Sequence, residues 1–308
     1  MTRGTTYGTT LGIFAACAFL AMSPNHLRAQ GAADWSATDK ALGRAGADQP
    51  GGVHKFGFPR SDLQVTLGGV ALKPALALGS WVAFKRASNG QSMAMGDLVL
   101  TPDEVAGVMA KLQQGGVVQS ALHNHLLGEA PHVMYMHIMA RGDAAKIAQT
   151  IHDALAVTKT PLQAPAAAPP AAAAGFDTTA VATTLGYSGK SNGGVYQISV
   201  PRTESIREGN DDVPPSMGVA TSINIQPTTG GRAVTTGDFV LLPGEVNAVI
   251  RALKSNGIAV TALHSHLMMD QPHVLFMHFW GNDEATKLAT GLRAALDATA
   301  MAPKHVTK

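Results

Sequence analysis

The sequence predicts an α+β protein of two homologous tandem domains, each a small, mainly antiparallel sheet with two packed helices. Three observations support this prediction. One stretch of sequence recurs at an offset of 141 residues, the separation of His123 and His264. Apolar residues with helical spacing precede it in both copies. Short runs rich in β-branched, aromatic and methionine residues lie within it and are typical of strands.

The repeat is clearest around the histidines. Residues 121–137 read ALHNHLLGEAPHVMYMH and residues 262–278 read ALHSHLMMDQPHVLFMH, without a gap. The same offset pairs Glu104 with Glu245, well upstream of the histidines. Self-similarity at a fixed offset marks a duplicated structural unit, so each motif is expected to occupy the same place in both domains.

The N-terminus has the features of an export signal. Arg3 precedes an apolar run over residues 11–22, and a short polar stretch then ends at Ala29. This pattern predicts a secretory signal peptide over residues 1–29 and a periplasmic or secreted protein. Cys17, the only cysteine, lies inside the run, so lipid attachment at Cys17 is a less favoured alternative. No segment reaches the ~20 apolar residues that a membrane-spanning helix needs.

The repeat domains are placed at residues 30–159 and 176–308. The segment 160–175 between them is dominated by alanine and proline, which predicts a semi-rigid linker. Loss of Arg3 and Arg28 with the signal leaves 21 of the 23 basic side chains, equal to the 21 acidic ones. A neutral chain lacks the positive surface that attracts nucleic acid, so the expected partners are a metal ion or a small molecule.

Each domain is expected to begin with strands and a helix. In the first domain the strands are predicted at 63–70, 80–85 and 93–100. Four apolar residues then share one helical face: Val105, Val108, Met109 and Leu112. Gly115 is expected to end this helix. Asp97 and Asp238 each follow a glycine and are interpreted as turn residues.

Two more strands and a closing helix complete each domain. In the first domain the strands are predicted at residues 117–125 and 133–139. The closing helix is indicated by three apolar residues one turn apart: Ile147, Ile151 and Leu155. Asp143 and Asp283 are predicted to cap this helix in the first and second domains.

The histidines are concentrated in the two matching clusters, which contain eight of the twelve. Side chains two apart along a strand share a face, so His123 and His125 are expected to converge. His137 should return beside them on the neighbouring strand. Imidazoles that meet in this way suit zinc, copper and other transition metals. The predicted ligands in the two copies are His123, His125, His137, His264, His266 and His278.

An alternative is that these histidines are core or hairpin residues satisfied by the backbone. A cluster that occurs twice favours ligation instead. His132 and His273 lie beside the motif prolines and are less favoured as ligands. Thioethers at Met268 and Met269 would favour copper, so zinc and copper are both open.

Two glutamates form a further pair of candidates. Residues 101–104 fit a capping box, in which Glu104 accepts a hydrogen bond from the backbone of the cap residue. The second copy has Leu242 at the cap position, which leaves Glu245 unexplained by capping. Glu104 and Glu245 are therefore candidates for a general base or for a residue that supports a metal ligand.

The two histidine motifs, with the flanking segments GDLVLTPDEV, GDFVLLPGEV and GVYQISVPR, resemble the LppY/LpqO-like family of bacterial exported proteins and lipoproteins. The resemblance covers essentially the whole mature chain. It implies an exported location and a repeated domain, and it supplies no activity. In that family an arginine often follows the motif proline, whereas this chain has His132 and His273, which argues against either histidine as an essential ligand.

Three functions are compatible with these features. The first is an exported protein that binds a transition metal at duplicated histidine sites. The second is a metal-dependent hydrolase in which a glutamate activates water. The third is a periplasmic module that binds a small molecule or a protein. The two clusters could form separate sites or meet as one composite site.

Overall fold

The computed structural model describes residues 1–2, 4, 33–163 and 175–301. Nearly all of the predicted signal peptide, the lipid attachment at Cys17 and most of the predicted linker lie outside the described residues. Among those described, no helix is both long and apolar enough to cross a bilayer. The fold below belongs to the compact unit that begins at Ala33.

The first repeat builds a six-stranded antiparallel sheet with the order β1-β2-β5-β6-β8-β7. Its elements are α1 (Ser36–Leu42), β1 (Ala47–Gln49), β2 (Val53–Pro59), β3 (Thr66–Leu67), β4 (Val70–Ala71), α2 (Pro74–Ala77), β5 (Gly79–Arg86), β6 (Ser92–Leu100), α3 (Val105–Gln114), β7 (Val118–His123), β8 (Met134–Gly142) and α4 (Ala144–Leu155).

The second repeat builds a second six-stranded sheet with the matching order β9-β10-β13-β14-β17-β15. Its elements are α5 (Thr178–Leu185), β9 (Lys190–Asn192), β10 (Val195–Pro201), β11 (Ile206–Glu208), β12 (Asp211–Val213), η1 (Pro215–Met217), β13 (Ala220–Pro227), β14 (Arg232–Leu241), α6 (Val246–Ser255), β15 (Ala259–His264), β16 (Asp270–Gln271), β17 (Leu275–Glu284) and α7 (Ala285–Asp297). The predicted α+β class with two homologous tandem domains is confirmed.

Helices cover one face of each sheet. The apolar stripe predicted after Pro102 forms α3, in which Val108 and Leu112 are fully buried. In α4, Ile151 and Leu155 are fully buried, and the Asp143 carboxylate accepts a hydrogen bond from the Lys146 backbone N–H at 2.9 Å, as an N-cap does. The sequence did not predict α1, which packs on α4, or α5, which packs on α7, nor the four-residue α2 of the first repeat.

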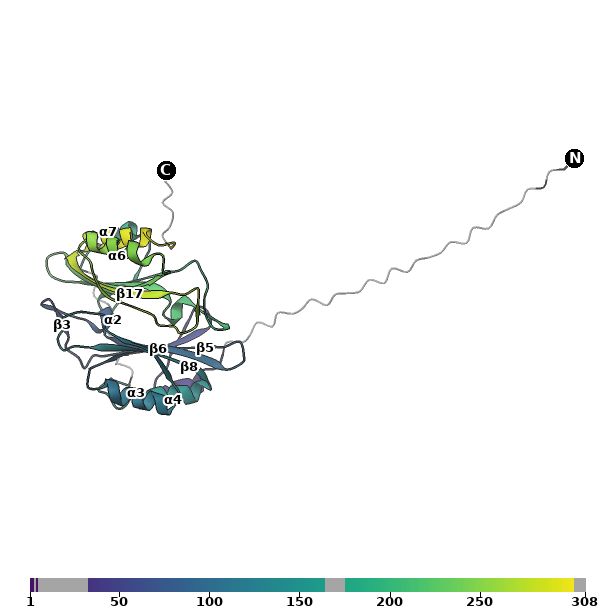
Figure 1. The fold of residues 1–308 in the computed structure, drawn as a ribbon, viewed down its shortest axis with the longest axis horizontal. Helices are drawn as coiled ribbons and strands as arrows, with labels where there is room; N and C mark the ends of the chain where they lie inside the picture. The colour runs from purple at the N-terminus through teal and green to yellow at the C-terminus, as the bar shows by residue number, and fades with distance from the viewer. Residues whose placement is uncertain (3, 5–32, 164–174, 302–308) are drawn as a thin grey trace. The chain divides into compact units, whose positions relative to one another are not determined.

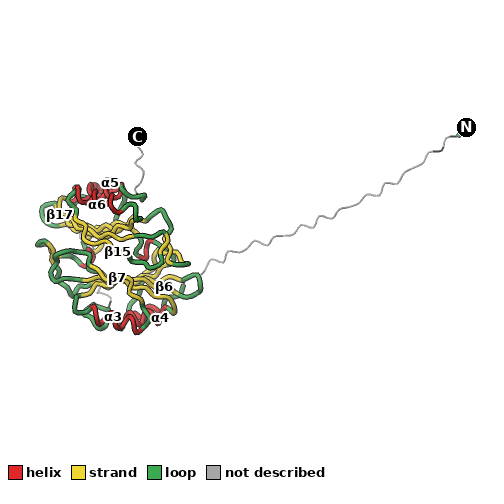
Figure 2. The backbone as a smooth tube through the Cα atoms, viewed as in Figure 1, coloured by secondary structure: helices red, strands yellow, loops and turns green. Residues whose placement is uncertain are grey.

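The opposite faces of the two sheets pack against each other, which gives the order helices, sheet, sheet, helices (Figures 1 and 2). Two apolar clusters between the sheets contain residues of both repeats. One cluster contains Met95 of the first repeat and Phe276 of the second, and the other contains Tyr135 and Val234. The two repeats therefore share one interior, and the strands that carry the histidine motifs lie within it.

Two predicted elements are wrong. The expected strand at 63–70 is instead two short strands, β3 and β4, joined by Gly68 and Gly69. Both glycines have positive φ, 57° and 79°, so they form the tight turn of a hairpin. Asp283 is not the cap of the closing helix, because it lies within β17 and α7 begins two residues later.

Candidate metal centre

The two motifs place their histidines at corresponding points of the two sheets. His123 ends β7, His125 follows it, and His137 lies in the adjacent β8 directly opposite Asp97 of β6. In the second repeat, the corresponding arrangement holds for three residues: His264, His266 and His278. Strand alternation thus directs each set toward the space between the sheets.

The two sets of histidines meet in one cluster. Three pairs of rings from different repeats lie close together, with centroid separations of 3.6 Å, 3.8 Å and 3.4 Å; the first pair is tilted and the other two are stacked. These pairs are His123 with His264, His125 with His278, and His137 with His266. His123 and His264 are equivalent residues of the two repeats. In the other two pairs, His125 stacks on the equivalent of His137, and His137 stacks on the equivalent of His125. This reciprocal pairing is expected when an approximate twofold axis relates the repeats. The arrangement is one composite cluster.

Contacts between the motif strands hold this cluster together. β7 and β15 lie in contact. The Asn124 amide donates a hydrogen bond to the Thr261 backbone carbonyl at 3.2 Å, and the Thr261 hydroxyl donates to the His125 carbonyl at 2.5 Å. The positions of the imidazoles in one repeat therefore depend on the backbone of the other.

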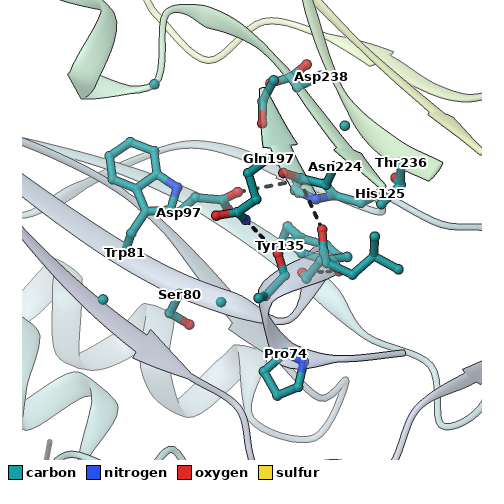
Figure 3. A pocket seen from close by; sticks show the side chains of 18 of the residues that line it. Pro74, Ser80, Trp81, Asp97, His125, Tyr135, Gln197, Asn224, Thr236 and Asp238 are labelled. Carbon is teal, nitrogen blue, oxygen red and sulfur yellow. Dashed lines mark hydrogen bonds and ion pairs between the residues drawn. The ribbon is translucent and has the colours of Figure 1, made fainter. Parts of the chain in front are cut away.

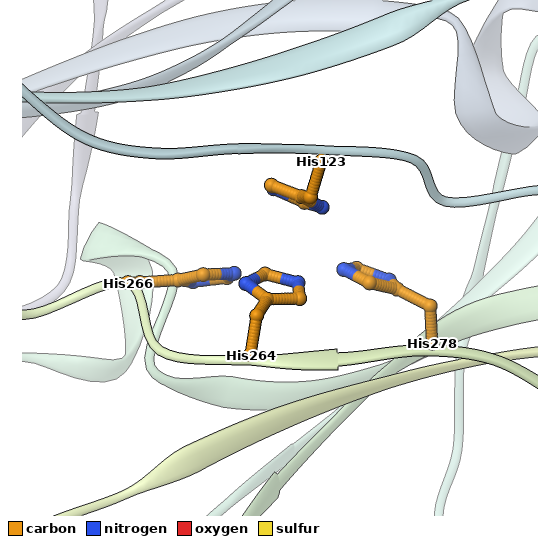
Figure 4. Close-up of side chains that lie close together, drawn as sticks. All are labelled: His123, His264, His266 and His278. Atoms are coloured by element: carbon orange, nitrogen blue, oxygen red, sulfur yellow. The ribbon is translucent and has the colours of Figure 1, made fainter.

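All six histidines have a buried Nε2 atom without a hydrogen-bond partner in the described part of the chain. A buried nitrogen that has lost water without gaining a partner costs about 1–3 kcal/mol. Six such atoms in one place call for a ligand that satisfies them together. Four of the rings, His123, His264, His266 and His278, direct their nitrogens toward a common space (Figure 4).

The other ring nitrogen, Nδ1, is oriented by the backbone in three of the histidines. His278 Nδ1 lies 2.9 Å from the Gly237 carbonyl. His123 and His264 Nδ1 lie 3.3 Å and 3.4 Å from the carbonyls of the residues that follow them. A carbonyl oxygen can only accept a hydrogen bond, so the proton belongs on Nδ1 and the lone pair on Nε2. This tautomer is the one that metal-ligating histidines commonly use.

Two aspartates join the cluster, although the sequence argument had interpreted them as turn residues. Asp97 Oδ2 lies 3.4 Å from His125 Nε2 and 3.5 Å from His137 Nε2. Asp238 of β14 is its counterpart, and one oxygen of each carboxylate is buried without a partner. Within the described residues, two sets of donor atoms lie within 4.8 Å of one another: Asp97, His123, His125 and His137, and His123, His264, His266 and His278.

Burial keeps the imidazoles neutral. It lowers the pKa of all six, and the positive charge that neighbouring imidazoles would carry lowers most of them further. The pKa of His264 falls to about 4. At neutral pH the Nε2 lone pairs are therefore available to a cation. Burial, and then the charge of Asp97, raises the pKa of Asp238 well above its ordinary value.

Aromatic side chains support the rings from the same strands. The Tyr135 ring stacks on His125 at 3.4 Å between centroids, and Phe276 stacks on His266 at 3.5 Å. The Tyr135 hydroxyl donates to the Ala77 carbonyl, which fixes the position of its ring. These contacts hold His125 and His266 in place without using their nitrogens.

A cavity of about 770 Å³ opens on this cluster (Figure 3). Its wall includes four of the histidines and both aspartates: His125, His137, His266, His278, Asp97 and Asp238. A ligand of small-molecule size could thus reach an ion held by the histidines.

Glu104 and Glu245, predicted as a general base or as supporting residues, lie elsewhere. The fully buried Arg60 binds Glu104 with two N–H groups, at 2.7 Å and 3.1 Å, and binds Asp62 as well. Arg202 does the same with Glu245 and Glu204. Neither glutamate is among the donors that cluster with the histidines, nor does either line the cavity. Their geometry argues against the role of general base.

Capping explains Glu245 as well as Glu104, contrary to the expectation from Leu242. The Leu242 backbone N–H donates to Glu245 at 2.8 Å, as the Thr101 N–H donates to Glu104 at 2.9 Å. This half of a capping box needs only a backbone donor, so leucine serves as well as threonine. Burial alone would raise the pKa of Glu104, but its hydrogen bonds from Arg60 and from backbone N–H groups outweigh burial and lower the pKa.

The residues ranked lower as ligands lie at the surface. His132 pairs with Glu129, and His273 pairs with Asp270; about half of each histidine side chain is exposed, 49% and 54%. Met268 and Met269 are each 63% exposed. No thioether is therefore among the donors that cluster with the histidines in the described chain.

Comparison with known proteins gives a family. Two segments, residues 36–157 and 179–298, match one family model, described as a domain of unknown function (DUF1259). No curated protein matches the chain. Among solved structures, a trimeric bacterial microcompartment shell protein, PduB, is 13% identical over 83% of this chain and 90% of its own, with a TM-score of 0.22. EtuB from Clostridium kluyveri is 11% identical over 82% and 90%, with a TM-score of 0.19.

Proposed function

The chain belongs to this family of unknown function through both of its repeats, and we propose that it binds a transition-metal ion in the composite histidine cluster. One observation carries the proposal: the six histidines of the cluster have buried Nε2 atoms without any hydrogen-bond partner in the described chain, and their donor atoms form two overlapping sets that share His123. The rings are neutral, and in His123, His264 and His278 a carbonyl beside Nδ1 leaves the lone pair on Nε2, so lone pairs of neighbouring rings repel one another. A cation relieves this repulsion and satisfies the nitrogens together.

Zinc is the ion that these donors suit best. Imidazole nitrogens and carboxylate oxygens are the ligands of zinc sites in proteins, and Asp97 stands beside the histidines as a possible further ligand. The thioethers that would favour copper, Met268 and Met269, are exposed. We expect the site to operate outside the cytoplasm, because residues 1–29 and the resemblance to LppY/LpqO-like proteins indicate export.

Elemental analysis of purified protein tests the proposal. The protein is stripped with a chelator, reloaded with zinc and dialysed, in parallel with two double variants. We expect the unchanged protein to retain zinc and His123→Ala with His264→Ala to lose it. The matched control, His132→Ala with His273→Ala, removes the two exposed histidines of the same motifs and should retain zinc. Equal zinc in both double variants, or no zinc in the unchanged protein, would overturn the proposal.

A second candidate function, metal-dependent hydrolysis, is favoured by the cavity. An ion held by the histidines would face a space of about 770 Å³, and Asp97 and Asp238 stand at its wall in place of the glutamates first considered. Such an ion can lower the pKa of bound water, and a carboxylate can accept the proton. Chromogenic ester and phosphoester substrates test this role. Zinc-dependent turnover that Asp238→Asn abolishes while zinc is retained would support it, and no turnover would leave binding alone.

A further inference from the structure

The cavity beside the histidine cluster has one basic residue in its wall, Lys55 of β2. The Lys55 ammonium lies 4.1 Å from the centre of the Trp81 ring and donates a hydrogen bond to the Ser216 carbonyl at 3.0 Å. Burial lowers the pKa of Lys55 to about 8, with the Asp97 charge acting against burial, so the amine remains mainly protonated at pH 7. No carboxylate lies within ion-pair distance of this amine in the described chain.

The second repeat shows that the fold does not require a charge here. β2 and β10 have equal lengths, and Gln197 occupies the place that corresponds to Lys55. Its amide donates to the Ala75 carbonyl of α2 at 2.8 Å, just as Lys55 donates to Ser216 of η1. Both side chains thus make the same contact with the opposite repeat, and a neutral amide suffices for it.

Other residues of the cavity wall also differ between the two repeats. Trp81 corresponds to Ser222, because each lies opposite the cluster aspartate in its sheet. The hydroxyls of Ser199, Ser222 and Thr236 line the cavity, and none has a hydrogen-bond partner among the described residues. The first repeat therefore contributes Lys55 and Trp81 to the wall, and the second contributes these three hydroxyls; Trp81 and Thr236 are labelled in Figure 3.

We propose that this cavity binds a small polyhydroxylated organic anion, with its carboxylate at Lys55 and its hydroxyls at Ser199, Ser222 and Thr236. The inference rests on the proposed metal site, because a divalent ion adds positive charge beside Lys55. Together with Lys55 the ion supplies three positive charges, whereas Asp97 and Asp238 supply at most two negative ones, so the cavity would carry a net positive charge. The volume, about 770 Å³, is within the range of small-molecule sites.

Calorimetric titration of the zinc-loaded protein tests the inference with three probes. Gluconate has a carboxylate and several hydroxyls. Sorbitol has the hydroxyls without a carboxylate, and hexanoate has the carboxylate without hydroxyls. We expect gluconate to bind and the other two to bind at least about tenfold more weakly. Lys55→Gln, the residue that the second repeat carries at this place, should weaken gluconate binding about twentyfold or more. Lys85→Gln is the matched control, since Lys85 is on neighbouring β5 and does not line the cavity.

The outcomes separate the two proposals. Zinc content is measured on every sample. Zinc-loaded protein that binds no gluconate at millimolar concentration, or a zinc-loaded Lys55→Gln variant that binds it unchanged, overturns the ligand inference and leaves the metal site intact. Protein that takes up no zinc overturns the metal site and the ligand inference together. Should Lys55→Gln unfold, Ser222→Ala with Thr236→Val replaces it and is expected to lower gluconate affinity toward that of hexanoate.

Discussion

At three histidines of the cluster, His123, His264 and His278, the surroundings distinguish the two ring nitrogens. His278 shows this most clearly, because Nδ1 contacts the Gly237 carbonyl while Nε2 is buried without a partner. Stacking of His125 on Tyr135 and of His266 on Phe276 fixes these rings through their faces and leaves their nitrogens free. The protein thus holds its imidazoles in place before any ion arrives, which reduces the entropy lost on binding.

Asp97 gives a prediction at this scale. Its Oδ2 atom lies 3.4 Å and 3.5 Å from His125 and His137 Nε2, where it can bind an ion or orient its ligands. Asp97→Asn should weaken zinc binding by about 10–100-fold, the usual effect of losing such a carboxylate. Competition with a chromogenic chelator measures the change. The exposed Asp103→Asn is the control, and equal affinities for the two variants would show that Asp97 has no part in the site.

Asp97 also shows why sequence alone placed some residues wrongly. The glycine before it suggested a turn, yet Gly96 lies in the middle of β6. A Cβ atom at Gly96 would lie 2.7 Å from the Trp81 carbonyl oxygen of the neighbouring strand. Glycine is needed there because two strands approach closely. Since that approach depends on tertiary packing, local sequence could not distinguish it from a turn.

At the scale of the secondary-structure elements, the buried arginines Arg60 and Arg202 connect each sheet to its helices by hydrogen bonds. Arg60 follows β2 and donates hydrogen bonds to the Glu104 carboxylate at the start of α3 and to the Val99 carbonyl at the end of β6. Glu104 also accepts from the Lys159 backbone N–H beyond α4 at 3.0 Å. One side chain pair therefore joins four elements of the first repeat, and Arg202 with Glu245 repeats the arrangement.

Glu104→Ala should consequently destabilise the fold without changing zinc content. Breaking a buried ion pair typically costs about 3–5 kcal/mol, and Asp62, which still pairs with Arg60, would offset part of this loss. Urea unfolding measures the loss, with the exposed neighbour Asp103→Ala expected to change stability by less than about 0.5 kcal/mol. A stable variant that lost zinc or activity would instead restore the catalytic role first considered for this glutamate.

Sequence periodicity predicted the elements that are locally encoded. Strand alternation put His123, His125 and His137 on one face, and helical spacing located α3 and α4. It could not tell whether the two clusters meet, because their meeting depends on how two sheets 141 residues apart in sequence pack. Pairs such as His137 with His266 are set by that packing.

Across the whole molecule, the two repeats share an interior in which apolar clusters surround polar groups. Neutral imidazoles there make the metal-free protein sensitive to acid. The folded pKa of His264, about 4, lies below its ordinary value of 6.5, so below pH 6.5 the unfolded chain binds more protons than the folded one. Stability is therefore present above about pH 6.5 and is lost as the pH falls toward 4.

Chelator-stripped protein should accordingly unfold at lower urea concentration at pH 5 than at pH 7. His264 alone contributes on the order of 1–2 kcal/mol to this difference, and its more deeply buried neighbours add to it. His264→Gln should show a shallower dependence on pH than the unchanged protein. Stability that stays level or rises on acidification would mean that these imidazoles are already protonated, or hydrated, in the folded state.

The central claim is that both repeats contribute to one metal site, and the zinc content of single-repeat variants tests it most directly. One variant carries His123→Ala and His125→Ala, and the other carries His264→Ala and His266→Ala. His123 belongs to both sets of donor atoms, the set formed with the first repeat and the set formed with the second. Each variant should therefore lose nearly all of its zinc. Retention of half of the zinc in both variants would mean two independent sites, and retention of all of it would mean that the histidines bind no metal.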